Sequence, residues 1–106
     1  MDRDGDPLDL IRRFRQRAEA ALPGRVVEVV LFGSRARGEA AADSDWDVAV
    51  FLTGQPGSAE RRTLSDIAYD LVVETDHYIQ HLPLPADRRH DDTLLLGHIR
   101  RDGIAL

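Results

Sequence analysis

Apolar residues recur at two different spacings along the chain, and each spacing predicts a different element. Over residues 7–22 they return every three or four positions, which predicts an amphipathic helix ended by Pro23 and Gly24. Val26–Phe32 is almost entirely apolar and rich in β-branched residues, as in a strand buried on both faces. Residues 47–52 predict a second such strand, and a turn over residues 53–57 follows it.

The rest of the chain continues this alternation. We expect a short helix capped by Ser34 and ending near residue 38, a helix over 58–74 capped by Ser58, and a strand over 77–82 closed by two prolines. Residues 93–101 predict a last helix with Leu94, Leu95 and Ile99 facing inward. The apolar tail at 104–106 either completes the core or contacts a partner. The order predicts one small α/β domain over residues 1–106, with about three strands covered by helices.

Composition narrows the classes of function. The 106 residues contain no cysteine and no apolar run of the roughly 20 residues that a membrane-spanning helix needs, so we expect a cytoplasmic protein. The net charge of −5 argues against a protein that binds duplex nucleic acid. All 14 basic residues are arginine, which excludes a P-loop lysine and a Schiff-base lysine.

Two acidic residues precede and begin the second predicted strand. Asp45 and Asp47 stand two positions apart, and side chains with this spacing on a strand point to the same face. Their carboxylates should therefore converge on one cation. Mg²⁺ suits such a pair, because it binds one or two carboxylates and fills its shell with water and phosphate oxygens. Trp46, between them, points away and is expected to pack in the core.

A small-residue turn follows the first predicted strand. Glycine at position 33 lets the backbone approach a ligand closely, and the Ser34 hydroxyl with nearby backbone N–H groups can accept a triphosphate. Arg35 and Arg37 add positive charge to the same segment. Because the two strands should be neighbours, we expect the turn and the carboxylates to meet at one end of the sheet.

Gly33-Ser34, followed after ten residues by Asp45-x-Asp47, resembles the signature of the DNA polymerase β-like nucleotidyltransferases. At this length the chain is similar to their minimal nucleotidyltransferase (MNT) domains. The resemblance implies an α+β fold with a mixed sheet of about three to four strands. It also implies transfer of a nucleoside monophosphate, often AMP from ATP, to a hydroxyl with Mg²⁺, and for many members an antitoxin role beside a HEPN-domain toxin.

The resemblance also implies roles for single residues. Gly33 and Ser34 would hold the phosphates, with Arg35, Arg37 and Ser44 completing the nucleotide site. Asp45 and Asp47 would be the catalytic metal ligands.

One position departs from the family pattern. Active members carry a third carboxylate on the later strand, as base for the hydroxyl and as a metal ligand, and the matching position here is Gln80. Asp76 would lie roughly 13 Å away along a regular strand, and Glu74 further still. Two hypotheses therefore stay open: an active transferase, or an impaired nucleotide-binding antitoxin that acts by forming a complex. The acceptor must dock from outside, and a homo-oligomer stays open.

Overall fold

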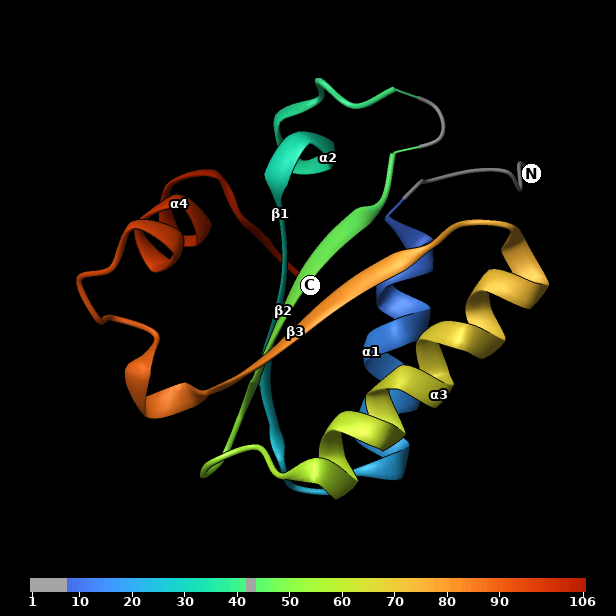
Figure 1. Ribbon diagram of the computed structural model, residues 1–106, viewed down its shortest axis with the longest axis horizontal. Coiled ribbons are helices and arrows are strands. Elements are labelled where there is room, and N and C mark those ends of the chain that lie inside the picture. The colour runs from blue at the N-terminus through green and yellow to red at the C-terminus, as the bar shows by residue number, and fades with distance from the viewer. Residues whose placement is uncertain (1–7, 42–43) are drawn as a thin grey trace.

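The computed structural model describes residues 8–41 and 44–106, and in it helices cover both faces of a four-stranded sheet (Figure 1). The predicted α+β class with a small mixed sheet is confirmed. The helices are α1 (Asp9–Ala21), α2 (Gly33–Arg37), α3 (Ser58–Thr75) and α4 (Leu94–Asp102), with a single 3₁₀ turn at Ala86–Arg88. The strands are β1 (Val26–Phe32), β2 (Trp46–Leu52), β3 (Ile79–Pro85) and β4 (Ile104–Ala105).

The sheet has the strand order β3-β2-β1-β4. Strand β1 runs antiparallel to both β2 and β4, whereas β2 and β3 are parallel and are connected through α3. The chain end thus has a defined place, because Ile104 pairs with Leu31 and Ala105 with Val30. Ile104 and Leu106 also pack against the core, so within this chain the apolar tail completes the sheet and the core.

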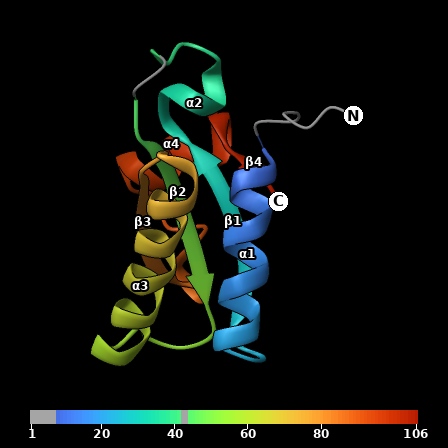
Figure 2. The same cartoon turned by 90° about the vertical axis from the view of Figure 1, so that its right-hand side faces the viewer.

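The two faces of the sheet have separate hydrophobic clusters. Helices α1 and α3 lie side by side over one face, and α4 lies over the other (Figure 2). Alternation along β2 divides its residues between the clusters: Trp46 and Val48 belong to the α1–α3 face, Ala49 and Phe51 to the α4 face. By the same alternation Asp47 belongs to the α4 face of the sheet.

The prediction that prolines close the third strand is wrong. Strand β3 continues through Pro83 and Pro85, which pair with Val50 and Leu52 of β2. The strand order explains this difference, because β3 lies at an edge of the described sheet. A residue without a backbone N–H is tolerated there when that position would not donate to the neighbouring strand.

The structure also corrects the predicted helix starts. Helix α2 begins at Gly33, so Ser34 lies inside it rather than at the cap. Helix α3 begins at Ser58, and the Gly57 N–H before it donates to the Glu60 carboxylate at 2.9 Å. A glutamate in the third helical position can satisfy such an N–H group, which leaves no need for a serine cap. The helix predicted from residue 7 begins at Asp9, and residue 7 is outside the described residues.

Of the three residues of α4 predicted to face inward, Ile99 does so, whereas Leu94 and Leu95 do not. Leu94 is 81% exposed and Leu95 42%, whereas Leu96 and Ile99 are buried. The cap decides this rotation: the Thr93 hydroxyl accepts a hydrogen bond from the Leu96 N–H at 3.2 Å. Positions 96 and 99 then share the inner face, because residues three apart lie on one side of a helix.

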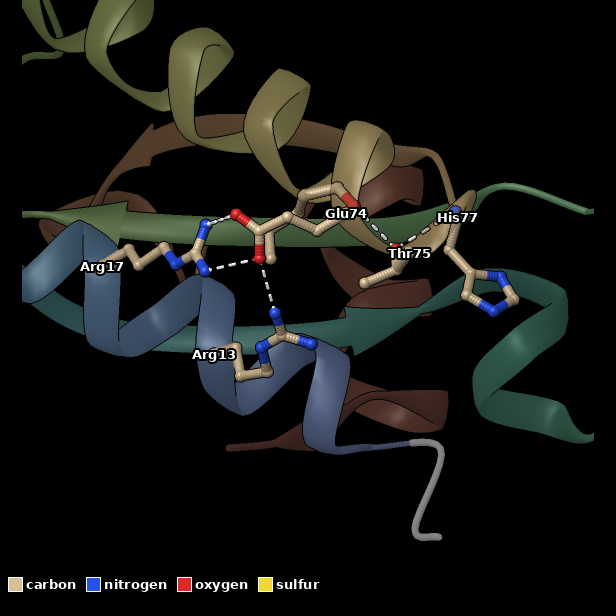
Figure 3. A network of polar contacts seen from close by, with 6 residues as sticks. Arg13, Arg17, Glu74, Thr75 and His77 are labelled. Atoms are coloured by element: carbon tan, nitrogen blue, oxygen red, sulfur yellow. Dashed lines mark hydrogen bonds and ion pairs between the residues drawn. The ribbon is translucent and has the colours of Figure 1, made fainter. Parts of the chain in front are cut away.

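An ion cluster connects α1 to the end of α3 (Figure 3). Arg17 donates two hydrogen bonds to Glu74, at 2.8 and 2.9 Å, and Arg13 donates a third at 2.7 Å. The hydrogen bond from Arg17 is the main reason that the pKa of Glu74 lies below its ordinary value. One residue later, Thr75 Oγ1 donates to the Leu71 carbonyl and accepts from the His77 N–H. These contacts fix the segment that leads into β3.

Among the described helices, none combines the length and apolarity needed to cross a membrane.

Candidate functional site

Asp45 and Asp47 lie together at the start of β2. Asp47 is the second residue of the strand and partly buried, whereas Asp45 precedes the strand and is exposed. Burial raises the pKa of the Asp47 carboxyl, and the negative charge of Asp45 raises it further. The two carboxylates are thus close enough to repel one another, as expected from their spacing. A divalent cation would offset this repulsion.

Gly33 lies directly against one of these carboxylates. The antiparallel pairing of β1 with β2 places Phe32 opposite Asp47, so that Gly33 is the next residue along. A Cβ atom on Gly33 would lie 2.5 Å from Asp47 Oδ2, and the residue has a φ of +76°. Both the space and the backbone angle therefore require glycine here. The turn and the carboxylates meet at one end of the sheet, as expected from the sequence.

Arg35 bonds within the protein rather than pointing outward. Its Nε and Nη2 atoms donate to the Ser44 carbonyl at 3.2 and 2.8 Å, and its guanidinium lies 4.2 Å from the ring centroid of Trp46. Trp46 itself is 5% exposed and packs in the core, as predicted. The spacing of apolar residues does not predict the contact of Arg35 with Trp46. Its only signal in the sequence is an aromatic residue between two acids.

The other predicted ligands lie around the same turn. Arg37 donates to Glu39 at 2.9 Å and lies 3.8 Å from Asp102, so it bridges α2 to the end of α4. The Ser44 hydroxyl accepts from the Ala41 N–H. Ser34 is partly buried in α2, and its backbone carbonyl accepts from Glu39. Their roles as nucleotide ligands stay predictions.

Gln80 is the partner of Asp47 across the parallel pair of strands. The register of β2 with β3 sets Asp47 beside Gln80, and both belong to the face that α4 covers. Asp76 ends α3 in a left-handed conformation before β3 begins, and Glu74 is bound to the arginines of α1. Across residues 8–41 and 44–106 no three acidic, histidine or cysteine side chains are grouped as a metal site. The donor set is therefore two carboxylates, which suffices for Mg²⁺ with phosphate oxygens and water.

A separate cavity of about 500 Å³ opens on the same face of the sheet. Glu28, Val30 and Phe51 form its floor, and Arg89 and Arg100 are among the residues around it. None of the predicted site residues lines it, and Phe51 is four positions from Asp47 on β2, which is roughly 13 Å. Sequence reasoning missed this cavity because its residues come from separate elements that only the fold brings together.

The comparison with known proteins gives the family. Residues 11–94 match the nucleotidyltransferase domain family, and the chain belongs to it. A protein of Methanocaldococcus jannaschii named "Putative protein adenylyltransferase MJ0141" is 29% identical over 72 residues, which cover 62% of this chain and 73% of that protein. The chain is therefore a minimal nucleotidyltransferase domain, as the motif predicted.

Solved structures share the fold. A crystal structure of a mutant MntA–HpeT toxin–antitoxin superposes with a TM-score of 0.63 and 20% identity, over 95% of this chain and 72% of the matched one. A crystal structure of a toxin–antitoxin with AMP-PNP gives a TM-score of 0.62 and 20% identity, over 87% and 68%. At such low identity the likeness supports only the shared arrangement of helices and strands. The activity has to be inferred from the residues of the site.

Replacing Gly33 with alanine should displace the Asp47 carboxylate. Gly38 is a matched control, because it has a φ of +75° but nothing within 4 Å of an added Cβ atom. Both alanine variants should lose about 1–2 kcal/mol of unfolding free energy from the left-handed backbone. Only Gly33→Ala should also lose the rise in melting temperature caused by Mg²⁺ and AMP-PNP. A full rise in Gly33→Ala would contradict the role of this contact.

Replacing Asp47 with asparagine should change how stability depends on pH. Because the folded-state pKa of Asp47 is raised, its contribution to stability is greatest below the ordinary carboxyl pKa of about 3.9 and is lost as the pH rises through the folded value. Asp47→Asn lacks this loss, so its stability relative to the wild type should increase with pH. Urea unfolding in EDTA between pH 3 and 8 measures the difference. A difference that is constant or falls with pH would refute the stated cause.

Proposed function

We propose that this chain transfers AMP from ATP to a hydroxyl group on a partner protein, as the antitoxin of a toxin–antitoxin pair with a HEPN-type toxin. The observation that carries the proposal is the contact of Gly33 with the Asp47 carboxylate, beside Asp45, in a chain of the nucleotidyltransferase family. The name of the M. jannaschii relative and the AMP-PNP in a toxin–antitoxin of the same fold support the choice of nucleotide and partner.

Each residue of the turn and strand has a role in the proposal. Asp45 and Asp47 would hold Mg²⁺, which would neutralise charge on the triphosphate and on the departing pyrophosphate. Gly33 leaves room for the phosphates beside the backbone, and the Ser34 hydroxyl donates to a phosphate oxygen. In the reaction the acceptor oxygen bonds to the α-phosphorus, the bond to pyrophosphate breaks, and the hydroxyl proton passes to solvent water.

The position of Gln80 favours a second candidate function. An amide beside Asp47 cannot accept the proton of the acceptor hydroxyl, and it supplies a weaker ligand than a carboxylate. In this alternative the chain binds ATP and Mg²⁺ through the same turn and aspartates, transfers AMP slowly or not at all, and neutralises its toxin by forming a complex.

A transfer assay tests the first candidate. The full chain is incubated with ATP labelled at the α-phosphate, Mg²⁺ and the product of the neighbouring gene. We expect labelled partner protein, and none with the Asp45→Asn/Asp47→Asn variant. Gln80→Glu should increase the rate at least about tenfold by supplying a base, whereas the control Gln80→Met should not. No label from the wild type or Gln80→Glu, with ATP binding intact in thermal melts, would refute the transferase.

A neutralisation assay tests the second candidate. The toxin is expressed with the wild-type chain or with Asp45→Asn/Asp47→Asn, and cell growth and complex formation are measured together. If complex formation is sufficient, the double variant should protect as fully as the wild type, because it keeps the surface and loses only the metal ligands. Loss of protection by a variant that still binds the toxin would exclude this candidate. Absence of Mg²⁺-dependent ATP binding to the wild type would exclude both.

A further inference from the structure

Arg35 connects the turn at Gly33 to the segment that carries Asp45. It is the third residue of α2, and its two hydrogen bonds to the Ser44 carbonyl close the loop between α2 and β2. Two donors on one acceptor hold the guanidinium plane in a single orientation. The Ser44 carbonyl belongs to the peptide unit that ends at the Asp45 nitrogen, so this contact fixes the backbone immediately before the acid.

The other side of Asp45 is fixed by Trp46. The indole ring lies under the Arg35 guanidinium and packs in the core, and the backbone N–H of Trp46 donates to the Tyr78 carbonyl at 2.9 Å. The His77 ring lies edge-on to the same indole, with the ring centroids 6.0 Å apart. Asp45 is thus an exposed acid between two residues that Arg35 contacts directly.

We propose that Arg35 is a positioning residue, which holds Asp45 where a divalent cation needs it, and not a ligand of the phosphates. The role rests on the function proposed above. Each aspartate then has its own positioning residue. Gly33 sets the place of Asp47 by direct contact, and Arg35 sets the place of Asp45 through Ser44 and Trp46. A metal ion bound by two carboxylates and a phosphate requires these three ligands at fixed separations. Residues that orient such ligands therefore have a strong effect on metal affinity.

The geometry requires arginine rather than any cation. The planar fork reaches one carbonyl with two donors while its face stacks on an aromatic ring, and a lysine ammonium does neither in the same way. This distinguishes positioning from simple charge attraction, in which lysine would replace arginine. Arg25 is a matched comparison at the other end of β1, because its Nε and Nη2 atoms also donate to a single carbonyl, that of Thr53, outside the Asp45 segment.

The experiment compares Arg35→Lys, Arg35→Gln and the control Arg25→Lys in the full chain. Mg²⁺ is titrated in the presence of saturating AMP-PNP, and binding is followed by the fluorescence of Trp46, the single tryptophan. Acrylamide quenching of the same indole without ligand reports whether the stacking contact is lost. Isothermal titration of AMP-PNP at saturating Mg²⁺ gives the nucleotide affinity separately.

Positioning predicts that Arg35→Lys and Arg35→Gln both raise the Mg²⁺ midpoint about tenfold and both increase quenching, while Arg25→Lys does neither. A phosphate ligand predicts instead that Arg35→Lys keeps the wild-type midpoint and only Arg35→Gln weakens nucleotide binding, which would overturn the proposal. Increased quenching with an unchanged midpoint would also overturn it, since the contact would then be structural only. If the wild type itself shows no Mg²⁺-dependent binding, the proposed function fails, whatever the quenching shows.

Discussion

The contact between Gly33 and the Asp47 carboxylate organises the candidate site. It exists because β1 and β2 are antiparallel neighbours in a register that sets Phe32 opposite Asp47. The end of one strand and the start of the other then lie at the same edge of the sheet, and the residue after Phe32 must leave the strand beside an acid. Only glycine combines the left-handed backbone with room for that carboxylate. The glycine turn and the two aspartates are therefore parts of one structure.

Metal binding and catalysis at this site would depend on different residues. Burial and a like charge raise the pKa of Asp47, and such a pair is a natural ligand for a divalent cation. Proton removal from an acceptor needs a further group, and the neighbouring strand presents an amide at that register. Under the proposed function, metal binding depends on β2 and proton removal on β3, so a chain of this fold can keep one while losing the other. Glu74 does not replace the missing third carboxylate, because its side chain is bound by Arg13 and Arg17.

Much of the fold and the site could be predicted from local pattern. Helical spacing and buried strands identified the main elements, and the motif placed the turn and the aspartates together. The errors arise from contacts that the spacing of apolar residues does not show, namely strand pairing between distant segments and helix caps between residues three apart. Pro83 and Pro85 are compatible with a strand only because β3 lies at an edge. Leu94 and Leu95 are exposed because the Thr93 cap sets the rotation of α4. The contacts of Arg35 with Ser44 and Trp46 form only when the loop between α2 and β2 closes. The spacing of apolar residues does not predict that closure.

The sequence by itself determined the family and the chemical types present at the site: a glycine turn, two aspartates at strand spacing and a glutamine where an acid is expected. These depend on residue identity and short spacing, which are local properties. The tertiary structure decided which groups face each other. Strand register set Asp47 against Gly33 and Gln80, and the fold of the loop brings Arg35 onto Ser44 and Trp46. Such pairings arise only when distant segments pack, because burial and hydrogen bonding act between neighbours in space.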